Sequence, residues 1–336
     1  MTFTIRPGVR EKIGLLFGVG GPSGSGKTYT ALLLATGIGG KIGMIDTEAG
    51  RALHYAPPPG KKANPAKGTF DFLHLDFSPP FTPERYVDAV RALEEEGVNV
   101  IVIDSMTHEW LGEGGCSDIQ AAEAERMAKD KKTGEILPWK LEVVTAPSWK
   151  IPKRRHTRMM SRFVQTRTHI IFCFRAQEKV KLVKRPGEGT EVVPIGFQPL
   201  CEKNFPYELS GSFLLHPNKP GCPDYSLPHK LNADLQNIFR DGELVGIEAG
   251  RRLKEWSEVG ETRPPEDKAA IGARDLLEKI EDAGVKVAEL IATPEIEKQI
   301  KWLEKNRHEL AKQVQQAIDA ALASGVIGEE SEEMQT

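Results

Sequence analysis

The sequence predicts an α/β fold with a mostly parallel central sheet, followed by a small helical region at its C-terminal end. Over most of the 336 residues, short apolar runs alternate with helix-forming segments, a pattern typical of parallel sheets. The run Val98–Asp104 is continuously apolar and rich in β-branched residues, as strands buried on both faces are. After Trp256 aromatic residues become rare and apolar residues recur at helical spacing, which predicts the helical region.

Each element of the first third has a recognisable local signal. Apolar runs and alternation predict strands, whereas Thr82 as a cap with Pro83 in the first turn predicts a helix that ends near Glu96. A segment rich in Pro, Gly and Lys, Ala56–Lys67, predicts a loop. The other expected elements are strands at Ile13–Val19, Lys41–Asp46, Phe70–Asp76 and Val98–Asp104, and a helix at Gly26–Gly37.

The middle of the chain predicts two helices and two strands. We expect a glycine-rich loop at Gly112–Gly115, a hairpin or mobile loop around Pro186-Gly187, helices near Asp118–Asp130 and Ser148–Thr166, and strands at His169–Phe174 and Glu208–Leu215. The domain prediction is a core over residues 1–258, a polar linker at 259–267, a helical domain at 268–326 and an acidic, disordered tail at 327–336.

Composition restricts the cellular setting. No run reaches the roughly 18–20 apolar residues of a membrane span, and the first residues lack the basic and apolar regions of a signal peptide. Four cysteines lack the spacing of a metal site, so we expect reduced thiols: Cys116, Cys173, Cys201 and Cys222. These features predict a cytoplasmic protein without a membrane partner.

The segment Gly21–Thr28 matches the phosphate-binding pattern G-x-x-x-x-G-K-[ST] in full. Its glycines let backbone N–H groups surround phosphate oxygens, Lys27 would reach the β- and γ-phosphates, and the Thr28 hydroxyl would bind Mg²⁺. An apolar strand precedes the pattern and a helix follows it, as the motif requires. The sequence therefore predicts ATP and Mg²⁺ as cofactors, with contacts at Gly21, Pro22, Ser23, Gly24, Ser25, Gly26, Lys27, Thr28 and Tyr29.

Hydrolysis needs two further carboxylates. Asp104 ends the most apolar strand, where a carboxylate would hold Mg²⁺ through water. A second group must orient or deprotonate the attacking water. Glu48, just after the strand Lys41–Asp46, is the favoured candidate, and Glu109 is the alternative.

Three motifs together resemble the RecA/RadA-type ATPase core: Gly21–Thr28, the sequence MIDTE at 44–48 and the sequence IVIDS at 101–105. The resemblance implies a RecA-like P-loop core in which Glu48 activates water. It also implies a γ-phosphate sensor near Arg175–Gln177 and a mobile DNA-binding loop at Glu178–Val193. The family usually has Gln or Asn as sensor, whereas the aligned residue here is Arg175, with Gln177 two positions further on.

Two stretches narrow this resemblance. Asp104–Trp110 and Phe172–Lys179 are similar to RecA-like ATPases that bacteriophages encode for single-strand annealing and recombination. That similarity, which covers about residues 13–216, implies a DNA-stimulated ATPase that forms homo-oligomers in the host-cell cytoplasm. It also implies a single-strand-binding or replication protein as a partner.

Basic residues are concentrated in one segment. Between Ala146 and Arg185 the chain has twelve Lys or Arg and one Glu, although its net charge is −3. Clustered cations bind nucleic acid by neutralising phosphates, so we expect single-stranded DNA to bind with little sequence preference. The predicted contacts are Lys153, Arg154, Arg155, Arg158, Lys179, Lys181, Lys184 and Arg185. The alternative is a solvated helix face and a loop that touches nucleotide or a neighbouring subunit.

These observations predict an ATPase that acts on single-stranded DNA in phage recombination or annealing. A helicase-loader or motor-type DNA ATPase is the first alternative. A small-molecule kinase and a non-hydrolysing, nucleotide-dependent scaffold are alternatives of another class. The kinase is disfavoured because the basic segment extends over 40 residues.

Overall fold

The computed structural model describes residues 12–185, 189–260 and 267–333. The chain divides into two compact units, residues 1–261 and 262–336. The division falls inside the segment 259–267, where the sequence predicts a linker. Within the described residues, no helix has the length and apolar character that crossing a membrane requires.

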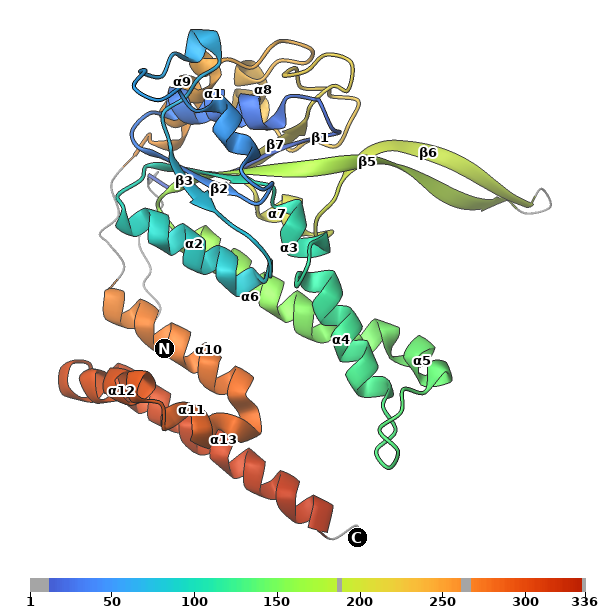
Figure 1. Cartoon of the computed structure of the whole chain (residues 1–336), viewed down its shortest axis with the longest axis vertical. Helices are drawn as coiled ribbons and strands as arrows, with labels where there is room; N and C mark the ends of the chain where they lie inside the picture. The colour runs from blue at the N-terminus through green and yellow to red at the C-terminus, as the bar shows by residue number, and fades with distance from the viewer. Residues whose placement is uncertain (1–11, 186–188, 261–266, 334–336) are drawn as a thin grey trace. The chain divides into compact units, whose positions relative to one another are not determined.

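A seven-stranded sheet forms the centre of the first unit (Figure 1). Six strands pair in parallel in the order β3-β2-β4-β5-β1-β7, and β6 pairs antiparallel with β5. This arrangement confirms the predicted α/β class with a mostly parallel sheet. The strands are β1 (Leu16–Gly21), β2 (Ile42–Asp46), β3 (Leu73–Asp76), β4 (Val100–Asp104), β5 (His169–Arg185), β6 (Gly189–Pro199) and β7 (Gly211–Leu214).

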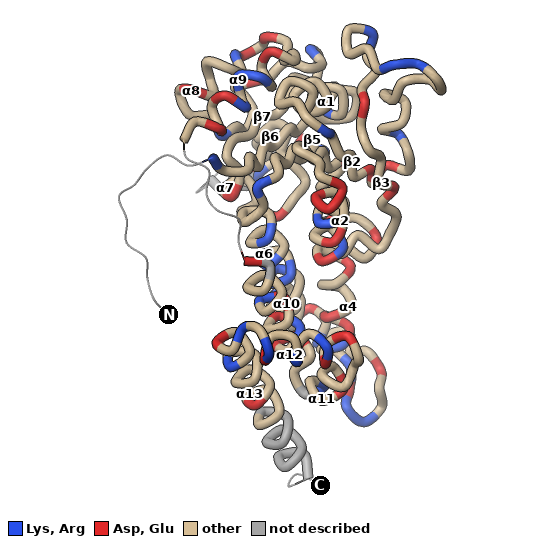
Figure 2. Tube along the Cα trace, turned by 90° about the vertical axis from the view of Figure 1, so that its left-hand side faces the viewer, with Lys and Arg blue, Asp and Glu red and all other residues tan. Residues whose placement is uncertain are grey.

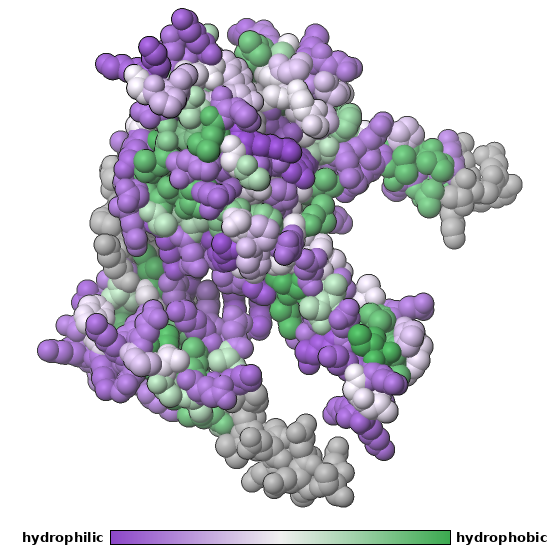
Figure 3. Space-filling view, viewed as in Figure 1, coloured by the Kyte–Doolittle hydropathy of each residue, from purple (hydrophilic) through white to green (hydrophobic). Residues whose placement is uncertain are grey.

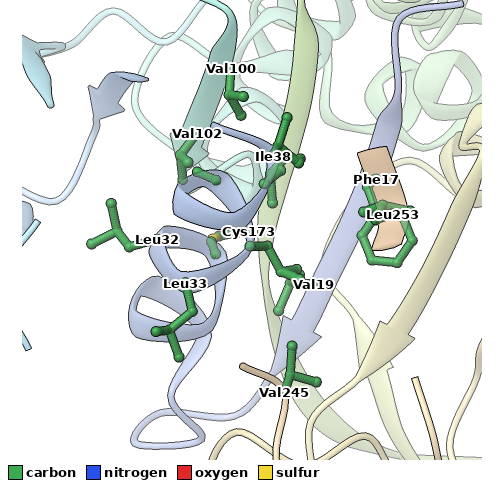
Figure 4. Packing of buried hydrophobic residues seen from close by; sticks show 14 of the residues in the cluster. Phe17, Val19, Leu32, Leu33, Ile38, Val100, Val102, Cys173, Val245 and Leu253 are labelled. Carbon is green, nitrogen blue, oxygen red and sulfur yellow. The ribbon is translucent and has the colours of Figure 1, made fainter. Parts of the chain in front are cut away.

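Helices cover both faces of this sheet, which is why β1, β2 and β4 are buried along their whole length. In β4, Val100 and Val102 belong to the core under α1, whereas Ile101 and Ile103 belong to the core beside α2 and α6. Figure 4 shows the first core, in which α1 lies against side chains of β1, β4 and β5. The covering helices are α1 (Lys27–Ile38), α8 (Ala233–Ile238) and α9 (Ile247–Ser257) on one face, and α2 (Pro83–Glu95) and α6 (Lys150–Gln165) on the other (Figure 1).

Shorter elements connect these layers. The longest of them that the sequence did not predict is α5, in which only Val144 and Ser148 are buried, so its apolar residues show no clear core period. Pro147 also lies inside this helix, in its last turn. The connecting elements are the 3₁₀ helices η1 (Arg51–Tyr55) and η2 (Pro65–Lys67), and the helices α3 (Thr107–Leu111), α4 (Cys116–Ala128), α5 (Pro138–Ser148) and α7 (Phe205–Glu208).

The strand that was expected to end at Phe174 continues to Arg185 and pairs with β6. The structure therefore has the hairpin, one of the two alternatives that the sequence left open here, where the resemblance implied a mobile loop at Glu178–Val193. Alternation of basic and apolar residues over 179–182 suits a strand, and β6 supplies the backbone partners that a loop would lack. The dipeptide Pro186-Gly187, on which the loop prediction was centred, lies outside the described residues.

Helices form the described part of the second unit, residues 267–333, and Leu276, Ile280, Leu303 and Val314 belong to its core. The unit comprises α10 (Lys268–Ala283), η3 (Gly284–Lys286), α11 (Val287–Ile291), α12 (Pro294–Asn306) and α13 (His308–Glu333). One feature differs from expectation, because α13 runs into the segment 327–336 that was expected to be disordered. Extending an existing helix adds a hydrogen bond for each residue fixed, and glutamate is a good helix former.

Candidate nucleotide-binding site

The parallel sheet brings the predicted site residues to one edge. Gly21 at the end of β1 is paired in register with Arg175 of β5. Asp46 at the end of β2 is paired with Asp104 at the end of β4, and Glu48 follows two residues later. The carboxyl ends of strands in open α/β sheets are where ligands bind. Segments that are distant in the sequence therefore meet at this edge.

The loop Gly21–Gly26 has the backbone conformation that its glycines permit. Gly24 and Gly26 have φ angles of 77° and 85°, in the left-handed region that favours glycine. Lys27 starts α1, and its Nζ donates a hydrogen bond to the carbonyl of Pro22 at 2.8 Å. Burial lowers the pKa of Lys27 below its ordinary value. The Lys27 ammonium group thus lies over the loop Gly21–Gly26, whose backbone conformation is the one that phosphate-binding loops adopt.

Thr28 and Asp104 meet at the start of α1. The Thr28 hydroxyl donates a hydrogen bond to Oδ2 of Asp104 at 2.5 Å, and the carboxyl is buried. Burial raises the pKa of Asp104 to about 6, although the hydrogen bond from Thr28 opposes the shift. A hydroxyl and a carboxylate oxygen are donors that Mg²⁺ prefers, and it takes its remaining ligands from phosphates and water. These two residues therefore fit a Mg²⁺ that accompanies a nucleotide.

Glu48 and Arg175 are in direct contact. Oε1 of Glu48 accepts hydrogen bonds from Nε and Nη2 of Arg175 at 2.9 and 2.5 Å. Oε2 of Glu48 accepts a weaker one from Arg51 at 3.3 Å. The two residues that the resemblance assigns to water activation and γ-phosphate sensing thus lie side by side. Gln177 lies further along β5, exposed, with Gln198 opposite it in the hairpin.

Glu109, the alternative base, lies in the protein interior. Its side chain is buried, and Oε1 accepts a hydrogen bond from the Cys116 thiol at 3.1 Å. The Nδ1 atom of His156 lies 3.0 Å from the same oxygen. Burial, followed by the charge of Glu109, raises the pKa of Cys116 far above its ordinary value. This geometry favours Glu48, whose side chain is 15% exposed, over Glu109 as the carboxylate that water reaches.

Three residues that the sequence did not single out connect the strand ends. Oγ1 of Thr47 accepts a hydrogen bond from the amide of Ser105 at 2.7 Å and lies 2.7 Å from Nδ1 of His108. Oγ1 of Thr107 accepts one from the amide of Arg175 at 2.9 Å. Burial and the charge of Arg175 lower the pKa of His108. The only signal was their position just after strands, which is too common to identify a site.

The basic residues predicted to bind DNA fall into two groups. On α6, Lys153 and Arg154 are exposed and Arg158 is half-buried, and Figure 2 shows further Lys and Arg along this helix. Arg155 instead makes a two-pronged contact with Glu84 of α2, at 2.7 and 2.5 Å. Its guanidinium therefore joins two helices, and this ion pair would compete with a DNA phosphate for the same side chain.

The second group lies on the β5–β6 hairpin, which projects from the sheet (Figure 1). Lys179 and Lys181 are both exposed. They lie on the same face of the ribbon, because successive side chains of a strand point to opposite faces. Val180 and Leu182 point to the other face and are 58% and 66% exposed. Figure 3 shows hydrophobic side chains gathered there. The side chains of Lys184 and Arg185, also predicted contacts, lie outside the described residues.

The fold and the site define a P-loop nucleoside triphosphatase with Lys27, Thr28 and Asp104 at its centre. Comparison with protein families agrees, because the family described as an AAA domain matches residues 14–196, more than half of the chain. The chain belongs to this family, whose members are nucleotide-dependent ATPases. A search of curated proteins found no match.

Proposed function

We propose that the protein hydrolyses ATP with Mg²⁺ and acts on single-stranded DNA in phage recombination or annealing. One observation carries this proposal. Strand β5 joins Arg175, which contacts Glu48 at 2.5 Å, directly to a projecting hairpin with exposed Lys179 and Lys181. A single rigid element therefore links the proposed hydrolytic centre to the proposed DNA contact.

At the nucleotide site each residue has a separate task. The loop Gly21–Gly26 would surround the phosphates, and Lys27 would neutralise the β- and γ-phosphates. Thr28 and Asp104 would hold Mg²⁺, which neutralises phosphate charge when bound. Glu48 would take the proton of the attacking water, provided that its carboxylate is released from Arg175.

The distance between the two ends of this link is short. Lys179 lies four positions after Arg175, which is about 13 Å of extended chain. A strand that is hydrogen-bonded on both sides near Arg175 transmits displacement better than a flexible loop does. DNA on the hairpin is therefore expected to alter the Glu48–Arg175 contact and with it the rate of hydrolysis. Lys153 and Arg154 on α6 would add sequence-independent affinity.

The proposal includes an oligomer of this protein on DNA. Homo-oligomerisation, with contact to a single-strand-binding or replication protein, would place several hairpins along one DNA strand. Light scattering with a non-hydrolysable ATP analogue and DNA tests the first part. A particle that stays monomeric under all these conditions would count against recombination by this protein.

ATP turnover measured with and without single-stranded DNA tests the function itself. We expect stimulation by DNA, loss of nucleotide binding in Lys27→Ala, and retained binding without turnover in Glu48→Gln. Turnover that needs a partner helicase would favour a loader, and turnover that needs a small phosphoryl acceptor would favour a kinase. Binding without any turnover in the wild type would favour a scaffold.

A further inference from the structure

The turn that carries Glu48 is held by a buried carboxylate just before it. We infer that Asp46 is a positioning residue that fixes Glu48 for water activation by bonding both ends of this turn. The inference rests on the proposed ATPase function and assigns a role to a residue that has none so far.

Asp46 ends β2 and is 1% exposed. Its Oδ1 atom accepts a hydrogen bond from the amide of Glu48 at 2.8 Å. Its Oδ2 atom accepts one from the amide of Ala52 at 2.9 Å and lies 3.1 Å from Nε2 of His74. One carboxylate therefore binds the backbone at Glu48 and the backbone four residues further on.

Between these two bonds the chain adopts a demanding conformation. Ala49 has φ of 56° and Gly50 has φ of 81°. Among the described residues, Ala49 is the one non-glycine residue with positive φ. A residue with a Cβ atom adopts this region only where its surroundings enforce it, and such residues cluster at functional sites. The two hydrogen bonds from Asp46 lie on either side of this conformation, at Glu48 and at Ala52.

The same turn sets the surroundings of the Glu48 side chain. Arg51 lies between Glu48 and Ala52, the two residues whose amides bind Asp46, and its guanidinium is 3.3 Å from Oε2 of Glu48. A change in the turn would move Glu48 and Arg51 together, whereas the P-loop and Asp104 lie on other segments. We therefore expect a loosened turn to slow hydrolysis without weakening nucleotide binding.

Asp46 itself is unsuited to act on the substrate. Its carboxylate is buried, and both oxygens already bind protein groups. Asp76, its register partner at the end of β3, is exposed and shares the same sheet edge. The same Asp-to-Asn substitution can therefore be compared at Asp46, which is buried and hydrogen-bonded, and at Asp76, which is exposed at the same edge of the sheet.

The test is the Asp46→Asn variant in the full-length protein, with kcat, KM and nucleotide affinity measured separately. Asparagine has one acceptor oxygen and cannot accept both amide hydrogen bonds. Because misplacement of a reacting group by about 1 Å can slow a reaction roughly 100-fold, we expect kcat to fall about 10- to 100-fold. KM and the affinity for a fluorescent ATP analogue should stay within about two-fold of wild type, as expected for interactions that matter only in the transition state. Asp76→Asn should change none of these three quantities.

A double variant separates positioning from independent damage. If Asp46 acts through Glu48, Asp46→Asn combined with Glu48→Gln should turn over no more slowly than Glu48→Gln alone in single-turnover assays. A further loss in the double variant, or weakened nucleotide binding with unchanged kcat, would overturn the inference alone. Normal turnover in Glu48→Gln would overturn the proposed base as well. Should Asp46→Asn fail to fold, His74→Gln removes only the third partner. We expect it to lower kcat with unchanged KM, and an unchanged kcat would refute the inference.

Discussion

Replacing Asp104 by asparagine should stabilise the protein when nucleotide and Mg²⁺ are absent. Burial raises the pKa of this carboxyl from 3.8 to about 6. The folded protein therefore holds the proton more tightly than the unfolded chain does, and ionisation destabilises the fold. The sign follows directly: the destabilisation is absent below about pH 4, grows as the pH rises to about 6, and is constant above that.

The size of the effect follows from the same shift. A difference of about two pKa units corresponds to about 3 kcal/mol. Asparagine carries no charge and keeps an oxygen that accepts the hydrogen bond from Thr28. The Asp104→Asn variant should therefore be more stable than wild type at pH 7 by up to about 3 kcal/mol. For a unit of this size that is a rise in Tm of up to roughly 6–12 °C.

Thermal unfolding in EDTA between pH 4 and pH 8 measures this difference. The two proteins should unfold at similar temperatures at pH 4 and diverge as the pH rises, whereas Asp76→Asn should follow wild type throughout. Saturating ATP and Mg²⁺ should reverse the order, because ligand binding stabilises only the protein that binds it. A variant that is less stable at pH 7, or a difference that does not depend on pH, would show that the buried charge is not the cause.

Three other variants test the remaining contacts. Arg175→Ala should leave ATP binding within about two-fold of wild type and abolish DNA stimulation of turnover, because Glu48 loses its link to the hairpin. Lys179→Ala with Lys181→Ala should weaken binding to single-stranded DNA and flatten its salt dependence by about 1.4 in slope, since each phosphate contact contributes about 0.7. An unchanged slope in fluorescence anisotropy would remove both lysines from the DNA site. Arg155→Ala should lower Tm slightly without changing that slope, which denaturation and anisotropy would show together.

Local patterns in the sequence identified most of the sheet and the centre of the site. The glycines and Lys27 require only neighbouring residues to be recognised, and Asp104 was identified because the run before it is apolar throughout. The Glu48–Arg175 contact joins residues 127 positions apart, so only the fold reveals it. The ion pair of Arg155 with Glu84 was missed for a related reason. A count of charges along the chain does not show that Glu84 lies opposite on α2.

The extension of β5 illustrates a second limit. Residues beyond Phe174 leave the covered part of the sheet, so the signal of a doubly buried strand ends there although the strand itself continues. Beyond that point, pairing with β6 stabilises the strand, and its alternating Lys and apolar residues show two exposed faces. Alternation of this kind is compatible with a loop as well as with a ribbon, and only a partner strand decides between them.

The buried charges explain why the site is built at some cost to stability. Burial lowers the pKa of Lys27 and raises that of Asp104, so in both cases the surroundings favour the neutral form. An ATP molecule with Mg²⁺ would supply the opposite charges that both groups lack, and the energy released on binding would offset their desolvation. A site that is strained when empty binds its ligand with groups already in place, so less reorganisation is needed at the moment of reaction. Substitutions that make the free protein more stable at these positions should therefore be the ones that abolish its activity.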